Sequence, residues 1–255
     1  MYGGDTSSIA VTGTDGRLLV LDAGTAVRAL SDIASGLEQI DILVSHLHID
    51  HVQGLPFFQP LLDPDVQVDI WGPISTDMNI RERLSRYLSP PLFPVRIRDL
   101  PNVWFHDVPP GDFEVGPFKV LADLVSHPGP TLGYRLEEDG ASICYIPDHE
   151  PALAGGAVST DPEWMSGYRL ARGCQVLIHD SQYTDEEYAD RVGWGHTSHS
   201  HLLAFAAGAG VERLVTFHHD PGHDDSTLDA IHEDLRRRAD GFEIVPGKAG
   251  LVIDL

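Results

Sequence analysis

The string His46-Leu47-His48-Ile49-Asp50-His51 places four side chains that can bind a metal ion within six residues. It lies between an apolar segment, 42–45, and the apolar run 52–58. Polar groups in such surroundings are costly to desolvate unless they meet a partner. In an extended chain His46 and His48 project in the same direction, and a turn after them directs Asp50 and His51 toward a second point. We therefore expect two adjacent cations rather than one.

Further candidate ligands follow apolar segments that are typical of β-strands. They are Asp22, His127, Asp148, Asp180 and His218. Ligands of α/β sheets are commonly bound just beyond the strand ends, so we expect these residues and His46 to converge on one site. One alternative stays open, because His219 follows His218 and either imidazole is a candidate ligand.

A second constellation pairs an acid with a histidine. Asp180 ends the segment Leu-Ile-His-Asp, and His196 follows 16 residues later, just before an apolar helical segment at 202–209. A carboxylate in this position fixes the imidazole tautomer, and the imidazole then donates a proton to a leaving oxygen or stabilises charge on a phosphate. The alternatives are a helix-capping His196 with a surface imidazole and a turn-forming Asp180. His199 and His201 are predicted to lie on the helix surface.

Apolar runs alternate with helical patterns along the chain, which indicates an α/β protein. The predicted strands are Arg17–Leu21, Asp41–Ser45, Val66–Trp71, Phe118–Ser126, Ala141–Ile146, Gln175–His179, Glu212–Phe217 and Leu251–Asp254. A helix capped by Ser226 is predicted to end before Gly241. The proline-rich stretch at about 72–117 reads as an irregular excursion that covers the site, within one domain spanning 1–255.

Composition narrows the class of partner. Seventeen basic residues against 39 acidic ones give a net charge of −22, which argues against an extended nucleic acid, whose phosphates need Lys and Arg. A small anion remains compatible, because two divalent cations reverse the local field. No apolar run reaches the ~18 residues that cross a membrane, and the start of the chain does not resemble a signal peptide. We expect a cytoplasmic protein with two buried thiols, Cys144 and Cys174.

The excursion carries a local excess of positive charge. Its candidate substrate-binding residues are Arg81, Arg83, Arg86, Arg96 and Arg98. Guanidinium groups bind phosphates with two parallel hydrogen bonds, so one or two of them are candidates to hold an anionic substrate. The alternative is a solvated helix face that pairs with an acidic surface.

The His-x-His-x-Asp-His string resembles the signature of the metallo-β-lactamase superfamily. The surroundings of Asp22, His127, Asp148 and His218 are similar to that family's later motifs and occur in the same order, from about residue 2 to 221. The resemblance implies a four-layer αβ/βα sandwich with two mixed β-sheets and outer helices. Relatives of this type usually have another strand before residue 2, so whether a strand precedes residue 1 stays open, and the resemblance makes a homodimer plausible.

The resemblance assigns roles to these residues. It implies one metal held by His46, His48 and His127, and a second held by Asp50, His51 and His218. Asp148 bridges both metals, and Asp22 supports a metal-binding histidine. Nitrogen and carboxylate ligands suit zinc, manganese or iron, with zinc as the first expectation. Pro147, before Asp148, departs from the small residue that is usual there.

The Asp180–His196 pair is similar to that of the ribonuclease Z and phosphodiesterase branch. Ribonuclease Z, which processes the 3′ end of transfer RNA, usually carries a long basic arm between its third histidine and bridging aspartate. Here only 21 residues separate His127 from Asp148. We therefore predict a dinuclear phosphodiesterase of a small anionic diester such as a cyclic nucleotide, with Asp50, His196 and Asp180 as catalytic residues.

A transfer-RNA 3′-processing ribonuclease is kept as a less favoured alternative, and two further functions remain open. The same metal pair would hydrolyse a carboxylic ester, thioester or lactam by polarising a carbonyl. A metal-stabilised binding module without turnover belongs to a different class. Turnover of a phosphodiester, of a carboxylic ester or of neither distinguishes the three.

Overall fold

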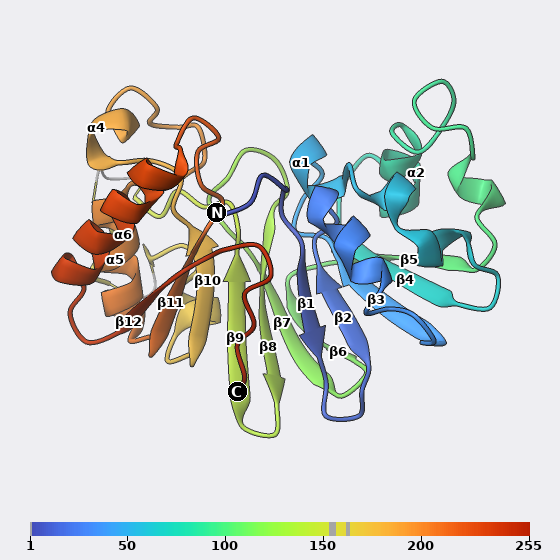
Figure 1. The fold of residues 1–255 in the computed structure, drawn as a ribbon, viewed down its shortest axis with the longest axis horizontal. Helices are drawn as coiled ribbons and strands as arrows, with labels where there is room; N and C mark the ends of the chain where they lie inside the picture. Colours follow the sequence, from blue (N-terminus) through green and yellow to red (C-terminus); the bar gives the residue numbers. More distant parts are fainter. Residues whose placement is uncertain (1, 153–156, 162–163) are drawn as a thin grey trace. The chain divides into compact units, whose positions relative to one another are not determined.

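The computed structural model describes residues 2–152, 157–161 and 164–255. Its contacts divide the chain into two compact units. The N-terminal unit is Asp5–Phe118, and the C-terminal unit is Lys119–Leu255 together with the first four residues. Figure 1 shows the elements of both units, coloured from the N-terminus to the C-terminus. That residues 1–255 form a single domain stays a prediction.

The sheet of the N-terminal unit has the order β1-β2-β3-β4-β5. These strands are β1 (Ile9–Thr12), β2 (Leu18–Leu21), β3 (Gln39–Leu43), β4 (Gln67–Pro73) and β5 (Val103–Val108). β1 is antiparallel to β2, whereas β2 to β5 are parallel, so the sheet is mixed. All four residues of β2 are buried, as expected for an inner strand covered on both faces.

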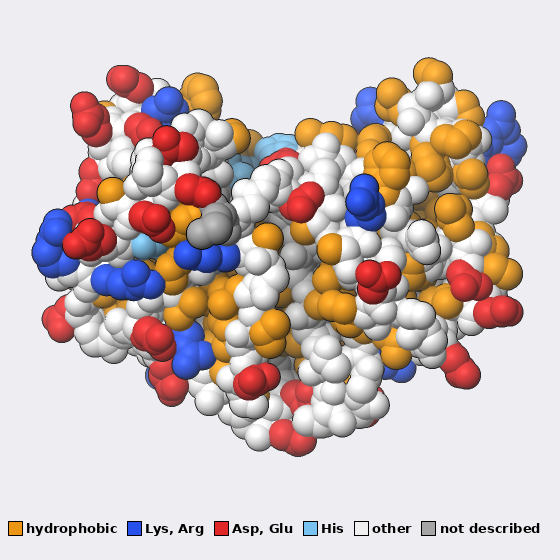
Figure 2. Space-filling model, in the orientation of Figure 1, with side chains coloured by type: hydrophobic (Ala, Val, Ile, Leu, Met, Phe, Trp, Pro, Cys, Tyr) orange, Lys and Arg blue, Asp and Glu red, His pale blue; other side chains and the backbone are white. Residues whose placement is uncertain are grey.

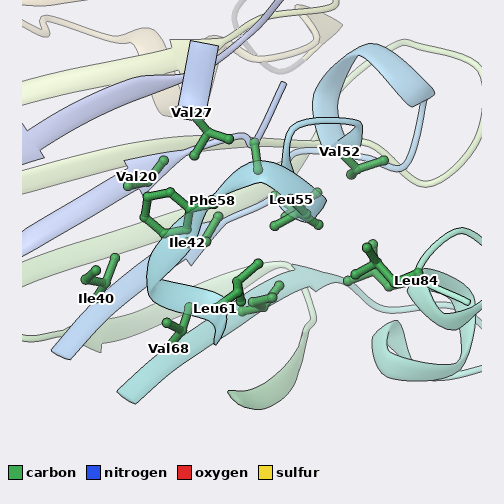
Figure 3. Packing of buried hydrophobic residues seen from close by; sticks show 14 of the residues in the cluster. Val20, Val27, Ile40, Ile42, Val52, Leu55, Phe58, Leu61, Val68 and Leu84 are labelled. Carbon is green, nitrogen blue, oxygen red and sulfur yellow. The ribbon is translucent and has the colours of Figure 1, made fainter. Parts of the chain in front are cut away.

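Short helices cover this sheet and close its core. They are η1 (Thr25–Ser31), α1 (Ile49–Val52), η2 (Leu55–Phe57), η3 (Gln59–Leu62), α2 (Ile80–Ser85) and η4 (Ile97–Asp99). Figure 3 shows Phe58 beside Val20 and Ile42, two side chains from neighbouring strands. Phe58 is fully buried although Phe57 is 64% exposed, so the turn between η2 and η3 directs only the second ring into the core.

The stretch 72–117 is more regular than its prolines suggest. It contains α2, η4, β5 and the strand β6 (Gly111–Val115). Asn79 and Glu82 form a capping box at the start of α2, in which each side chain accepts a backbone N–H of the other residue. That the stretch 72–117 covers the site stays a prediction.

The C-terminal unit holds six strands of the second sheet, in the order β12-β11-β10-β9-β8-β7. They are β7 (Phe118–Leu124), β8 (Leu132–Glu138), β9 (Ala141–Ile146), β10 (Val176–Asp180), β11 (Arg213–Phe217) and β12 (Glu243–Pro246). β9 to β12 are parallel, and β8 is antiparallel to both of its neighbours. An Asp139-Gly140 turn with positive φ at both residues joins β8 to β9, the backbone that two-residue hairpins require.

The helices of this unit are α3 (Tyr168–Ala171), α4 (Asp185–Tyr188), α5 (His199–Ala209) and α6 (Asp225–Arg238). α5 contacts β10, and α6 contacts β12 and α5, with Phe205 and Leu235 buried in one core cluster. Figure 2 shows acidic side chains around α4, whose first turn holds Asp185, Glu186 and Glu187. Negative charge at a helix N-terminus is stabilised by the helix dipole.

Two local predictions were wrong. Asp224, not Ser226, caps α6 and accepts the Thr227 N–H, because the chain leaves its extended conformation two residues earlier than expected. Residues 251–254 form no strand, and the last strand of the chain is instead β12, which pairs with β11. The two cysteines are buried thiols, as predicted. No helix in the described ranges is long and apolar enough to cross a bilayer.

Replacing Phe58 by alanine should lower the free energy of unfolding by about 3–5 kcal/mol, since a large ring leaves a cavity in a packed core. Chemical denaturation monitored by circular dichroism measures the change. Phe57→Ala is the matched control, and its exposed ring should cost no more than about 0.5 kcal/mol. Equal effects of the two substitutions would contradict this core.

Candidate metal centre

The candidate ligands of the N-terminal unit form one cluster: Asp22, His46, His48, Asp50 and His51. The ring centroid of His46 lies 4.4 Å from that of His48 and 4.2 Å from that of His51. His48 is extended, with ψ near 149°, and α1 begins at the next residue. The turn expected after His48 is therefore present, and it brings His51 back beside His46.

Asp22 stabilises this cluster by accepting hydrogen bonds. It follows β2 with a φ of 57°, a left-handed conformation that aspartate tolerates better than most residues. Its carboxylate accepts the Ser45 N–H at 2.6 Å, the Ser45 hydroxyl at 2.7 Å and the Nδ1–H of His51 at 2.7 Å. Because Nδ1 of His51 is the donor, its Nε2 carries the lone pair that a metal would bind.

Backbone hydrogen bonds fix α1 against the turn at Asp22. The Ala23 N–H donates to the His51 carbonyl at 2.8 Å, and the Gly54 N–H donates to the Ala23 carbonyl at 2.9 Å. A Cβ at Gly54 would lie 1.9 Å from the Gly24 carbonyl oxygen, so this close approach requires glycine. Asp50 is partly exposed, and its Oδ2 lies 3.4 Å from Nε2 of His51.

The candidate residues of the C-terminal unit surround Asp148, which follows β9 and is almost fully buried. Its Oδ2 lies 3.6 Å from Nε2 of His127 and 3.9 Å from Nε2 of His196, and its Oδ1 lies 3.5 Å from Nε2 of His218. Ligand atoms of Asp148, His196 and His218 all lie within 4.8 Å of one another. One carboxylate thus faces three imidazoles, a donor set that fits a divalent cation.

Asp180 and His196 lie in direct contact. Nδ1 of His196 donates to Oδ2 of Asp180 at 2.6 Å, while Oδ1 of Asp180 accepts the Gln182 N–H at 2.9 Å. Burial opposes protonation of His196, but the charges of Asp180 and Asp148 outweigh it and raise the pKa of His196. The imidazole is therefore oriented with its Nε2 toward Asp148.

His218 and His219 point to different surroundings. His218 has a φ of 53° at the end of β11 and faces Asp148. His219 instead contacts the rings of Tyr2 and His232, and its Nδ1 lies 3.2 Å from the Ser181 hydroxyl. Burial lowers the pKa of His219 to about 4, so it is a neutral packing residue. Of the two neighbours, only His218 joins the group around Asp148.

Sequence reasoning missed three polar residues behind this group, His149, Glu150 and His179. His149 and His179 form a buried pair in which their Nδ1 and Nε2 atoms lie 2.9 Å apart, and His179 donates to the Asp180 carbonyl. The signal was available, since Asp148-His149-Glu150 is a run of three polar residues directly after an apolar strand. The prediction that His199 lies on the helix surface was wrong: α5 turns it inward, where it donates to the Ser181 carbonyl.

The five candidate arginines of the excursion have different surroundings. Arg81 and Arg98 line a groove of about 490 Å³ on the N-terminal unit, together with Trp104 and Phe105. The guanidinium of Arg81 lies 6.0 Å from the ring centre of Phe105. Arg83 donates to the Pro73 carbonyl instead, and burial lowers the pKa of its guanidinium. Arg86 and Arg96 are exposed.

The chain is similar to known proteins in sequence and in structure. A family model described as the β-lactamase superfamily domain matches residues 17–219. The ribonuclease Z of Methanopyrus kandleri is 28% identical over 230 residues, which cover 80% of this chain and 77% of that protein.

Solved structures resemble the chain over nearly its whole length, among them the following two. The metallo-β-lactamase fold protein YhfI of Bacillus subtilis superposes with a TM-score of 0.71 at 16% identity, covering 98% of this chain and 92% of that one. The short form of human tRNase Z has a TM-score of 0.67 at 20% identity, with 98% and 92% covered. At these identities the likeness establishes the fold, and the predicted fold class is confirmed.

The prediction that excluded an extended nucleic acid as partner was wrong. Relatives that match over most of their length are named ribonuclease Z, and one of the structural neighbours is a tRNase Z. Net charge was an insufficient criterion, because a sum over the whole chain does not describe how basic residues are distributed over the surface.

The family model begins before Asp22 and ends beyond His218, so it includes the candidate ligands of both units. Each cluster combines imidazoles with carboxylates, which is the donor chemistry of a divalent metal site. The chain therefore belongs to the β-lactamase superfamily, has the metallo-β-lactamase fold and is a metal-dependent hydrolase.

Proposed function

We propose that this hydrolase is a dinuclear phosphodiesterase that cleaves RNA, with transfer RNA as the first substrate to test. The observation that carries the proposal is the 2.6 Å contact between His196 and Asp180, beside the buried Asp148. Departure of an alkoxide from phosphorus requires a proton donor, and an imidazole held by a carboxylate is suited to that task. The names of the relatives, ribonuclease Z and tRNase Z, support RNA as the substrate.

We propose as metal ligands the residues that the family resemblance implies. His46, His48 and His127 would hold one ion, Asp50, His51 and His218 the other, and Asp148 both. The donors are nitrogen and carboxylate oxygen, for which zinc is the first choice and manganese or iron the alternatives. When bound, such a pair lowers the pKa of water and neutralises charge on a phosphate.

Residues of the chain would accept and donate the protons that hydrolysis moves. Hydrolysis forms a bond from phosphorus to the oxygen of water and breaks the bond to the leaving oxygen. Asp50, partly exposed in the N-terminal cluster, would accept the proton from water. His196, protonated on both ring nitrogens as its raised pKa favours, would give the proton on its Nε2 to the leaving oxygen while Asp180 stabilises the ring.

A small phosphodiester such as a cyclic nucleotide is the second candidate substrate. The observation in its favour is the short connection between His127 and Asp148, which consists of β8, its Asp139-Gly140 turn and β9. This hairpin leaves no length for a separate basic arm in that interval. RNA and a small diester demand the same chemistry at phosphorus and differ in the length of surface they require.

Arg81, Arg98 and Trp104 are the residues we propose as an RNA contact. Single-stranded nucleic acid is bound by aromatic rings that stack on bases and cations that contact phosphates. The Trp104 side chain is 59% exposed in the same groove as both guanidiniums. Arg83 is not proposed as a phosphate contact, since it is bound to the Pro73 carbonyl, and the exposed Arg86 and Arg96 are secondary candidates.

His196→Ala should reduce kcat on an RNA diester by about 10²–10⁴-fold, because the leaving alkoxide loses its proton donor. On bis(p-nitrophenyl) phosphate the loss should be much smaller, since p-nitrophenolate departs without a proton. Steady-state assays of the zinc-loaded protein on both substrates test this difference. His201→Ala, on α5, is the control. Equal losses on both diesters, or hydrolysis of p-nitrophenyl acetate alone, would reject the proposal.

Asp22→Asn should weaken zinc binding by about 10–100-fold, the usual effect of removing a carboxylate that orients a ligating histidine. The Ser45 N–H and the His51 Nδ1–H donate to different oxygens of the carboxylate, so an amide, which has one acceptor oxygen, would leave one of them facing its NH₂ group. Competition with a chromophoric chelator measures the affinity. The control is Asp41→Asn, another buried aspartate in the same sheet, bonded to Trp71. If both variants bind zinc like the wild type, Asp22 does not support a ligand.

Arg81→Ala and Arg98→Ala should each weaken RNA binding and reduce the slope of log K against log salt by about 0.7, the value for one phosphate contact in a single strand. Fluorescence anisotropy with labelled RNA at several salt concentrations provides the slopes. Arg237→Ala, an exposed arginine paired with Asp234, controls for the loss of one charge. Unchanged slopes in both groove variants would show that the groove does not contact the RNA.

A further inference from the structure

Glu150 is a fully buried acid that the chemistry above does not use. A buried carboxylate is costly unless hydrogen-bond donors surround it. Here Oε1 accepts the Tyr188 hydroxyl at 2.7 Å and the Gly193 N–H at 2.8 Å, and Oε2 accepts the Gly195 N–H at 2.8 Å. Both oxygens are therefore committed, and two of the three donors belong to the backbone of the segment 193–195.

The main chain of Glu150 is tied to a different segment. Its N–H donates to the carbonyl of Ser126 at 2.8 Å, and Ser126 directly precedes His127. Its side chain is bonded to residues that lie 38 to 45 positions further along the chain. Glu150 thus connects the segment that carries His127 with the segment that leads into His196.

The segment 193–195 in turn contacts the imidazole of His127. The Gly195 carbonyl accepts a hydrogen bond from Nδ1 of His127 at 2.7 Å. A carbonyl only accepts, so Nδ1 of His127 carries the proton and Nε2 is directed toward Asp148. Gly195 has a φ of +89°, and a Cβ there would lie 2.4 Å from that Nδ1. The position of the Gly195 backbone therefore determines how the ring is held.

We propose that Glu150 is a positioning residue for both histidines. Its carboxylate fixes the segment 193–195, whose Gly195 carbonyl sets the tautomer and direction of His127. The same fixed segment delivers the next residue, His196, to Asp180. The consequence for catalysis depends on the phosphodiesterase proposed above, whereas the consequence for His127 does not.

Glu150→Gln is the test, because an amide presents one acceptor and one donor end. One of the two glycine N–H groups would then face an NH₂ group and lose its partner. In the metal-free variant, ¹⁵N NMR of the imidazoles should show His127 losing its single Nδ1–H form. Zinc affinity and kcat should each fall by about 10–100-fold, the effect typical of residues that orient ligands. KM should not change.

Glu187→Gln is the matched control, since its carboxylate bonds Thr184 and His223 outside the segment 193–195. Its His127 spectrum should equal that of the wild type. A Glu150→Gln protein that is less stable but keeps the wild-type His127 signals, zinc affinity and kcat would overturn the proposal.

Gly195→Ala provides a second approach if Glu150→Gln does not fold. It leaves the carboxylate intact and presses on the His127 ring, so an unchanged His127 spectrum would overturn the proposal as well. If the wild-type protein hydrolyses no phosphodiester, the proposed function fails, while the spectra of the metal-free variants still decide the role of Glu150.

Discussion

Asp22 and Asp180 are fully buried, and each accepts a hydrogen bond of 2.6–2.7 Å from Nδ1 of a histidine. The same constraint acts in both units: a carboxylate at a strand end must be surrounded by donors, and the imidazole that it receives is locked in one tautomer. The opposite nitrogen, Nε2, then lies near Asp50 in the case of His51 and near Asp148 in the case of His196. Each unit carries its own carboxylate for this purpose, so the orientation of its imidazoles is built within that unit.

Residues that directly follow a strand can carry such side chains without disrupting the regular structure of the sheet. Asp22 follows β2 and His218 follows β11, and both adopt a positive φ that the preceding strand residues could not share. A backbone of this kind costs on the order of 1–3 kcal/mol per residue and persists where surrounding contacts overdetermine it. At Asp22 those contacts are the two bonds from Ser45 and the one from His51. Local strain and ligand orientation are thus parts of the same arrangement.

Three further polar side chains support the group around Asp148 within the C-terminal unit. His149, His179 and Glu150 are fully buried, and their partners include the Asp180 carbonyl and the glycine backbone before His196. Burial lowers the pKa of His149 and of His179, so both rings are neutral supports. A hydrolase that must move protons at one imidazole benefits from neighbours that do not titrate near the same pH.

The sequence by itself determined the buried strands and the local string of candidate ligands at residues 46–51. The apolar runs at Leu18–Leu21, Ala141–Ile146 and Arg213–Phe217 sufficed because strand burial is a local pattern, and the turn after His48 followed from the spacing to His51. The separation of His218 from His219, the inward rotation of His199 and the loss of Arg83 to a backbone carbonyl were decided only by the tertiary structure. So was the bond from Glu150 to Gly195, 45 residues away. These partners are distant in the chain, and periodicity carries no information about which distant group a side chain will meet.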